Sequence, residues 1–137
     1  EPITPDEKGV LNLRADDADL HGQLIKLESK GSHTWVGFWD KPQEFISWKV
    51  KFTQPGKYKV NANVATIHKD IEFIVEVAGK QLAAKAPHTG KWDEWKGVGL
   101  GSVEIAQPGE QTVTVRPKDA KTWKAINLRS VRLTRSE

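Results

Sequence analysis

Apolar and polar side chains alternate along most of the chain, which is the pattern of a β-strand with one buried face. Within residues 44–52 the apolar positions of one face are Ile46, Trp48, Val50 and Phe52. The same alternation recurs in residues 57–66, 71–77 and 111–116. No window carries the apolar stripe of a helix, and residues 41–45 are compatible with one short helical turn at most. The pattern therefore predicts an all-β protein.

Turn sequences separate the predicted strands. Pro presets the backbone for the first central position of a turn, and Gly supplies the positive φ of the second. Such signals stand at residues 54–56, 78–80 and 107–109. About eight or more antiparallel strands joined in this way predict a β-sandwich of the jelly-roll type. Residues 10–137 are interpreted as one such domain, and residues 1–9, which contain two prolines, as a tether or a leading edge strand.

The composition narrows the chemistry that the chain can perform. Its 137 residues include no Cys, which excludes disulfides, thiolate nucleophiles and Cys-based zinc sites. No apolar run approaches the roughly 18 residues of a membrane helix, so we expect no membrane partner. No G-x-S-x-G, H-E-x-x-H or phosphate-loop motif is present, and we therefore predict that the domain is not an enzyme. The chain starts at Glu1 and contains no Met, which we interpret as a piece of a larger protein.

Positive charge is concentrated near the C-terminus. Residues 116–135 hold seven Arg and Lys residues against one acidic residue, whereas the whole chain has a net charge of +3. A field of one sign attracts polyanions. This stretch is therefore either an ordinary solvated surface or a patch that faces an anionic ligand.

The tryptophans fall into two groups. Trp48 lies on the apolar face of its strand and is predicted to be core, and Trp95 is predicted to pack under the hairpin that follows it. Trp39, Trp92 and Trp123 stand at predicted strand ends among polar and Gly residues, where the loops of a sandwich gather. Exposed indole rings there suit stacking against the C–H faces of sugars. They equally suit packing between the loops, and both interpretations stay open.

Five segments carry a resemblance to a known family. Residues 15–22 (ADDADLHG), 35–40 (WVGFWD), 45–65, 89–117 (beginning TGKWDEW) and 125–133 (AINLRSVRL) follow one another in the order seen in carbohydrate-binding modules of family 6 and family 35. The chain also resembles accessory β-sandwich domains attached to secreted bacterial fucosidases and sulfatases. The resemblance spans roughly residues 10–133, and it implies a galactose-binding-like jelly roll.

The resemblance implies a sugar-binding cleft between the loops at one end of the jelly roll. Trp92 matches the family's loop Trp, and Asn127 matches an Asn of the last strand. The family's first aromatic corresponds to Phe38 or Trp39. Strand alternation predicts that Phe38 points inward with Val36 and that Trp39 points to the opposite face, so Trp39 is favoured.

Three further residues are candidates for the same cleft. Trp123 and Lys124, just before the last strand, are predicted to form one wall. His88 lies near the predicted cleft and is either a ligand contact or an ordinary surface histidine. Some related modules instead bind sugars on the face of a sheet, and the sequence leaves that alternative open.

One acidic segment near the N-terminus is a candidate calcium site. Residues 17–28 nearly match a calcium-loop pattern, but His21 is a poor ligand for a hard cation and the flanks are predicted strands, so we reject an EF-hand. The resemblance implies a structural calcium ion near this segment, where Asp16 occupies the family's Glu position. The closing segment lacks the family's Asp. A structural calcium ion held by Asp16 is thus an open expectation, and no other cofactor is expected.

These observations predict a non-catalytic carbohydrate-binding module of a larger polysaccharide-active enzyme. Its expected partners are a carbohydrate, neutral or else acidic or sulfated, and the catalytic domain of the parent chain. We expect it to be secreted, periplasmic or on the cell surface, in a bacterium. The alternative is a structural accessory sandwich, in which the loop aromatics anchor an interface with the catalytic domain. Binding of single-stranded nucleic acid is physically conceivable for aromatic and basic residues, but the order of the segments argues against it.

Overall fold

Eleven β-strands form within residues 1–136, the part of the chain that the computed structural model describes. They are β1 (Val10–Arg14), β2 (Asp19–His21), β3 (Lys26–Lys30), β4 (His33–Gly37), β5 (Phe45–Phe52), β6 (Gly56–Ala65), β7 (Glu72–Val77), β8 (Lys80–Lys85), β9 (Lys96–Ile105), β10 (Gly109–Pro117) and β11 (Asn127–Arg135). One short 3-10 turn, η1 (Ala15–Asp17), follows β1. Within residues 1–136, no helix has the length and apolar character needed to cross a membrane.

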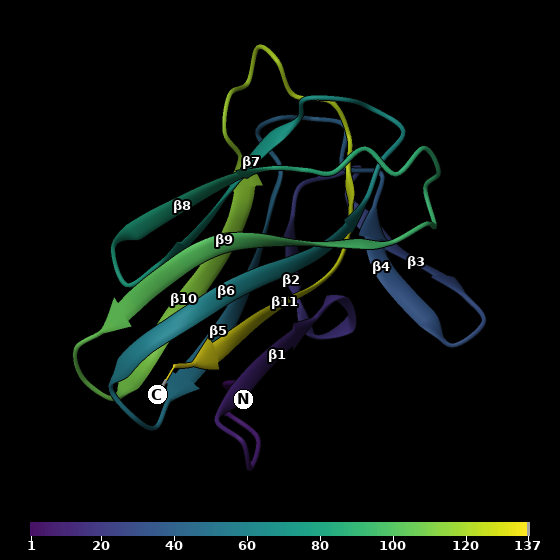
Figure 1. Cartoon of the computed structure of the whole chain (residues 1–137). Coiled ribbons are helices and arrows are strands. Elements are labelled where there is room, and N and C mark those ends of the chain that lie inside the picture. Colours follow the sequence, from purple (N-terminus) through teal and green to yellow (C-terminus); the bar gives the residue numbers. More distant parts are fainter. Residues whose placement is uncertain (137) are drawn as a thin grey trace.

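The strands form two antiparallel sheets that pack face to face (Figure 1). One sheet has the order β3-β4-β11-β6-β9, and β1 also pairs with β11. The other has the order β2-β5-β10-β7-β8. The predicted all-β sandwich of the jelly-roll type is confirmed. In the N-terminal segment, Ile3 forms an isolated parallel bridge to Val50 of β5.

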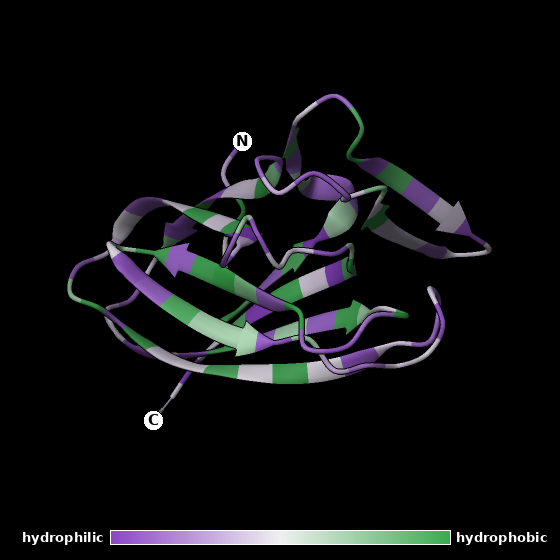
Figure 2. Cartoon of the chain, turned by 90° about the horizontal axis from the view of Figure 1, so that it is seen from above, coloured by the Kyte–Doolittle hydropathy of each residue, from purple (hydrophilic) through white to green (hydrophobic). Residues whose placement is uncertain are grey.

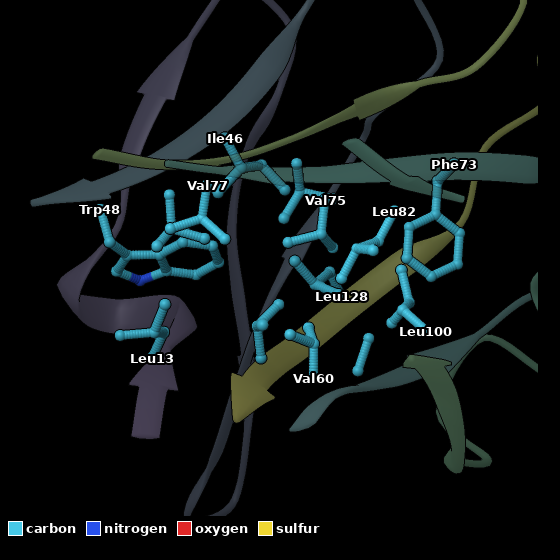
Figure 3. Close-up of a cluster of buried hydrophobic side chains, with 14 of the residues drawn as sticks. Leu13, Ile46, Trp48, Val60, Phe73, Val75, Val77, Leu82, Leu100 and Leu128 are labelled. Atoms are coloured by element: carbon cyan, nitrogen blue, oxygen red, sulfur yellow. The ribbon is translucent and has the colours of Figure 1, made fainter. Parts of the chain in front are cut away.

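The core lies between the two sheets and consists of the inward positions of each strand. Figure 2 shows apolar and polar positions alternating along the ribbons, as expected for strands with one buried face. Figure 3 shows Leu13, Ile46, Val60 and Leu128 from both sheets in one cluster. Trp48 is completely buried there, and its indole N–H donates to the carbonyl of Arg14 at 2.8 Å. The polar end of this large side chain is thereby satisfied inside the core.

One end of the first sheet positions the candidate site. Asn127, the first residue of β11, pairs with Ala65 at the end of β6. Leu128 pairs with Val36, next to the last residue of β4. Because the neighbouring strands are antiparallel to β11, β4 and β6 end where β11 begins. The segments that leave β4 and β6 and the segment that enters β11 therefore converge at this end.

Candidate functional site

A cleft of about 740 Å³ opens at this end of the sandwich. Its lining comes from β3 and β4, from the segments after β4 and β6, from the connection between β8 and β9, and from the start of β11. The lining residues are Glu28, Lys30, Trp35, Phe38, Asp40, Ile67, Gly90, Lys91, Trp92, Asp93, Ala125 and Asn127. Three aromatic rings, one isoleucine and several polar side chains are the mixture that binding clefts for small molecules usually show.

Phe38 and Trp39 take the opposite orientations to those predicted from alternation. β4 ends at Gly37, and Phe38 has a left-handed backbone with φ of 53°. This turn breaks the strand alternation, so that Phe38 is 47% exposed and lines the cleft. Trp39 is completely buried, and its indole N–H donates to the carbonyl of Glu44 at 2.7 Å. The prediction of Trp39 as an exposed cleft aromatic is therefore wrong, and Phe38 takes that place.

Trp123 is also buried rather than presented to the cleft. Its ring packs against the ring of Trp39, with centroids 4.7 Å apart. Its indole N–H donates to the backbone carbonyl of Trp39 at 3.0 Å. Lys124 and His88 are exposed, but neither lines the cleft. The prediction that Trp123 and Lys124 form one wall of the cleft is thus wrong, and of the two interpretations of His88 the structure fits the surface histidine. Trp123 instead packs on Trp39, the residue after Phe38.

Trp92 and Asn127 are brought together as the sequence predicts. Trp92 is 38% exposed in the cleft, and the ring of His68 meets its ring edge-on, with centroids 5.7 Å apart. The side-chain amide of Asn127 donates from Nδ2 to the backbone carbonyl of Trp92 at 2.7 Å. This bond fixes the loop that carries Trp92 to the first residue of β11. The amide oxygen of Asn127 takes no part in it and retains its capacity to accept a hydrogen bond.

Thr66 joins three of the segments that form the cleft. This residue is completely buried just after β6, and its hydroxyl donates to the carbonyl of Ala125 at 2.8 Å. The same hydroxyl accepts the backbone N–H of His68 at 3.0 Å. Its backbone carbonyl accepts N–H groups from Thr89 at 3.2 Å and Gly90 at 3.1 Å. Sequence reasoning missed Thr66, because a Thr at the end of a strand carries no signal of such long-range partners.

Glu44 braces the segment that carries Phe38 and Trp39. Its buried carboxylate accepts the backbone N–H groups of residues 23–25, at 2.6, 3.2 and 3.0 Å in chain order. Burial raises the pKa of this carboxyl, but the three backbone hydrogen bonds together outweigh burial, so the pKa of Glu44 lies below its usual value. A side chain at Gly22 would collide with this carboxylate, which explains the glycine there.

The charges around the cleft are of both signs. Lys30 and Lys91 stand against the carboxylates of Glu28, Asp40 and Asp93. The ammonium of Lys30 forms an ion pair with Asp93 at 3.2 Å. Glu28 accepts the indole N–H of Trp35 at 3.0 Å. The cleft therefore has no strong field of one sign that would select an ion.

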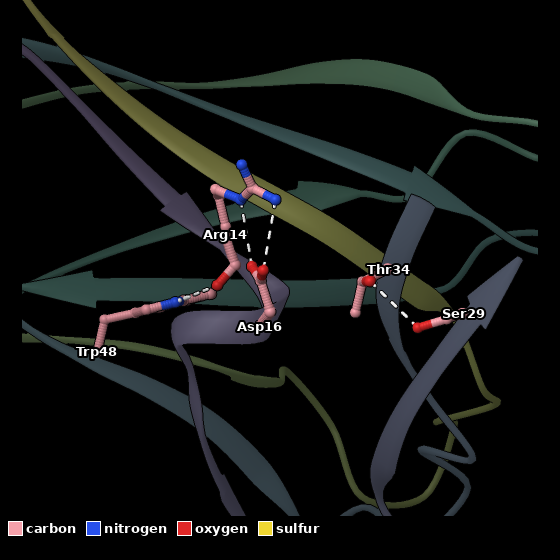
Figure 4. A network of polar contacts seen from close by, with 5 residues as sticks. All are labelled: Arg14, Asp16, Ser29, Thr34 and Trp48. Atoms are coloured by element: carbon pink, nitrogen blue, oxygen red, sulfur yellow. Dashed lines mark hydrogen bonds and ion pairs between the residues drawn. The ribbon is translucent and has the colours of Figure 1, made fainter. Parts of the chain in front are cut away.

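Asp16 lacks the surroundings of a calcium ligand. Its carboxylate pairs with the guanidinium of Arg14, at 3.2 Å to Nε and 3.3 Å to Nη2 (Figure 4). Among residues 1–136, no three His, Asp or Glu side chains are grouped so that they could hold a metal ion. A positive charge in direct contact with the carboxylate also disfavours a cation. The residues present do not fit the calcium site that the resemblance implies.

The fold and the cleft define the class of domain to which the chain is similar. The C-terminal family 6 carbohydrate-binding module of LamC, a marine laminarinase from Zobellia galactanivorans, is 19% identical, with 92% of this chain and 99% of that chain covered and a TM-score of 0.71. A β-1,3-glucan-binding family 6 module from Bacillus halodurans is 22% identical, with coverage of 99% and 100% and a TM-score of 0.74. A family 35 module from Clostridium thermocellum is 16% identical, with coverage of 93% and 98% and a TM-score of 0.73.

The resemblance to family 6 and family 35 modules is thus confirmed at the level of the fold. The likeness to the accessory domains of fucosidases and sulfatases stays a prediction. Residues 26–137 match the family described as Domain of unknown function (DUF5077), and the chain belongs to this family. A comparison with curated proteins found no match.

Proposed function

We propose that this domain is a non-catalytic carbohydrate-binding module that holds a sugar residue in the cleft. The observation that carries the proposal is the meeting of two exposed aromatic rings, Phe38 and Trp92, with the side-chain amide of Asn127 in one hollow. Aromatic rings remove the C–H faces of a sugar from water, and the amide oxygen of Asn127 would accept a hydrogen bond from a hydroxyl. Few polar contacts offset the cost of immobilising a sugar, so we expect weak binding.

The charges favour a neutral sugar ring in the cleft itself. Lysines and carboxylates line it together, and Lys30 is already paired with Asp93. The basic residues of 116–135 do not gather there. Arg116 pairs with Glu76 and Lys118 pairs with Glu72, and both glutamates lie on β7. An acidic or sulfated ligand would therefore need cationic contacts outside the cleft.

A β-glucan is the first ligand to test, because the Bacillus halodurans module of the same fold is described as binding β-1,3-glucan. We further propose that the domain belongs to a larger secreted polysaccharide-active enzyme of a bacterium and acts beside its catalytic domain. In that setting the module would hold the enzyme close to its polysaccharide substrate.

The alternative is a structural sandwich whose apolar residues Phe38, Ile67 and Trp92 pack on a neighbouring domain. Their exposure of 47%, 43% and 38% is compatible with an interface. Their position around a hollow with polar side chains, rather than on a flat surface, favours a small ligand.

A glycan array probed with the isolated domain tests the proposal, with laminari-oligosaccharides titrated in solution as a second measurement. The wild-type domain should bind at least one class of neutral glycan, and Trp92→Ala should abolish that binding. Leu24→Ala is the matched control, because Leu24 is 49% exposed and lies outside the cleft. No binding by the wild-type domain to any glycan would favour the structural alternative, and equal loss in the Leu24 variant would remove the assignment to this cleft.

A further inference from the structure

A second, polar pocket of about 300 Å³ lies beside the cleft. It is lined by β1, η1, the start of β4 with Ser32 just before it, and β11. Its charged and titratable side chains are the guanidinium groups of Arg14 and Arg129, the imidazole of His33 and the carboxylate of Asp16. The two guanidinium groups carry positive charge against the single carboxylate of Asp16, so this pocket differs from the cleft in its electrostatic character.

The two pockets follow one another along the same sheet face. Asn127 lines the cleft, and Arg129, two residues further along β11, lines the polar pocket. On the neighbouring strand β4, Trp35 lines the cleft and His33 lines the polar pocket. Residues two apart on a regular strand such as β4 share a face and are separated by about 7 Å. On β11 a β-bulge between Leu128 and Ser130 interrupts the regular register with β6 next to Arg129. β4 and β11 are antiparallel and adjacent. The path from Asn127 to Arg129 along β11 therefore points in the same direction as the path from Trp35 to His33 along β4.

Aromatic and cationic side chains connect the cleft with the polar pocket. The rings of Trp35 and Trp95 lie with their centroids 5.5 Å apart. The guanidinium carbon of Arg129 lies 5.8 Å from the centre of the Trp95 ring. Such a cation–π contact orients the guanidinium without using its N–H donors. A ligand leaving the cleft over Trp35 would therefore meet Arg129 next.

The guanidinium groups retain hydrogen-bond donors. Each guanidinium has about five N–H donors in a planar fork that matches carboxylate and sulfate oxygens. Asp16 occupies Nε and Nη2 of Arg14. Nη2 of Arg129 contacts Nδ1 of His33 at 2.6 Å, and Arg129 donates in this pair because a guanidinium has no acceptor. Ser32 and Ser130 add hydroxyl groups at the wall.

We propose that the polar pocket binds an anionic group, a sulfate ester or a carboxylate, on the sugar residue next to the one held in the cleft. The part that concerns the neighbouring sugar rests on the proposed function, whereas the anion site itself stands on the geometry of Arg14, Arg129 and His33. The two pockets together form a composite site, in which a neutral ring stacks on aromatic side chains and its neighbour presents an oxyanion to the guanidinium groups.

The first experiment tests the anion site alone. Sodium sulfate and sodium acetate are titrated separately into the domain at constant ionic strength, and the side-chain NMR signals of Arg129 and His33 are followed. Saturable shifts are expected. Arg129→Gln should raise the anion concentration that gives half of the maximal shift at His33 at least tenfold. Arg132→Gln is the matched control, because Arg132 is an exposed arginine of the same strand outside both pockets. Arg14→Gln serves as a second variant that leaves Asp16 without its partner and should also weaken anion binding.

The outcome of this titration decides the site and the type of anion. A stronger response to sulfate indicates a sulfate ester, and a stronger response to acetate indicates a uronic acid. No saturable shift, or equal responses in Arg129→Gln and Arg132→Gln, would overturn the anion site. Melting temperatures of all variants are recorded, so that loss of the fold is not mistaken for loss of the site.

The second experiment tests the composite site. Laminaritetraose, a form that carries one sulfate ester and a form that ends in a uronic acid are titrated into the wild type, Arg129→Gln and Trp92→Ala. The wild type should prefer an anionic form by about tenfold, and Arg129→Gln should remove that preference while neutral binding persists. Trp92→Ala should lose both. Unchanged preference in Arg129→Gln, or no preference in the wild type, would refute the composite site. If sulfate alone binds but no glycan does, the proposed function fails and the anion site remains.

Discussion

Two aromatic pairs at the same end of the sandwich have opposite roles. Phe38 and Trp92 are partly exposed and line the cleft, whereas Trp39 and Trp123 are buried and pack against each other. Phe38 and Trp39 are even consecutive in the chain. The difference comes from the backbone and the hydrogen bonds, because both buried indoles donate to backbone carbonyls while Trp92 is held through its own carbonyl. At this end of the molecule, the type of aromatic ring therefore does not determine whether the side chain is buried or lines the cleft.

Removing a buried ring should have the largest effect on stability. Trp39→Ala should lower the free energy of unfolding by about 3–5 kcal/mol, the typical cost of deleting a core aromatic. It also leaves the carbonyl of Glu44 without its indole donor. Urea denaturation monitored by circular dichroism measures the loss. A change below about 1.5 kcal/mol would mean that Trp39 is not the buried anchor described above.

Thr66 tests whether the cleft depends on the hydrogen bonds between the segments that form it. Thr66→Val keeps the shape of the side chain but removes its hydroxyl, which leaves the carbonyl of Ala125 and the N–H of His68 without their partner. We expect a loss of about 1–3 kcal/mol in stability and weaker sugar binding. Thr66→Ser retains the hydroxyl and should restore binding. Calorimetric titration and thermal unfolding of both variants provide the test, and equal behaviour of the two would argue against the hydroxyl as the link.

Removing an exposed ring should affect binding rather than stability. Trp92→Ala should cost less than about 1.5 kcal/mol, below the 3–5 kcal/mol of a core aromatic, because the ring is partly exposed and its backbone carbonyl remains for Asn127. The proposed glycan binding should nevertheless disappear. Thermal unfolding and glycan titration are measured on the same preparation. A stability loss as large as that of Trp39→Ala would place Trp92 in the core and refute its assignment to the cleft.

Acidification should weaken the hydrogen bonds that the Glu44 carboxylate accepts from residues 23–25. The pKa of Glu44 is lower in the folded state than its ordinary value of about 4.5. The stabilisation is therefore complete above the unfolded-state pKa and is lost as the pH falls through the lower folded-state pKa. Denaturant midpoints measured between about pH 6 and pH 2 should fall less steeply for Glu44→Gln than for the wild type below about pH 4.5. Parallel profiles would show that Glu44 contributes nothing to the acid sensitivity.

Metal removal should have the smallest effect. Asp16 pairs with Arg14, and no acidic cluster within residues 1–136 is arranged around it. Treatment with a chelator should therefore shift the melting temperature little. A decrease of more than about 10 °C would reveal a tightly bound ion through the linkage between binding and folding, and it would reverse this assignment.

The sequence by itself determined the all-β class and the buried face of the most regular strands. Strand alternation depends on local geometry, because successive side chains point to opposite faces whatever the rest of the chain does. The apolar face of residues 44–52 therefore predicted the burial of Ile46, Trp48, Val50 and Phe52. Trp92 and Asn127 were also identified from the sequence, through their resemblance to family motifs, and the structure places both in the cleft.

Only the tertiary structure decided which aromatic side chains face the cleft and what holds them. A single left-handed residue, Phe38, exchanged the predicted orientations of Phe38 and Trp39, and alternation cannot foresee a break of this kind beyond the end of a strand. The partners of Thr66 lie up to 59 residues away along the chain, and the polar pocket joins β1, β4 and β11. Such contacts depend on how the two sheets and their loops pack. The sequence pattern records which face of a strand is buried, but not which distant segments will meet.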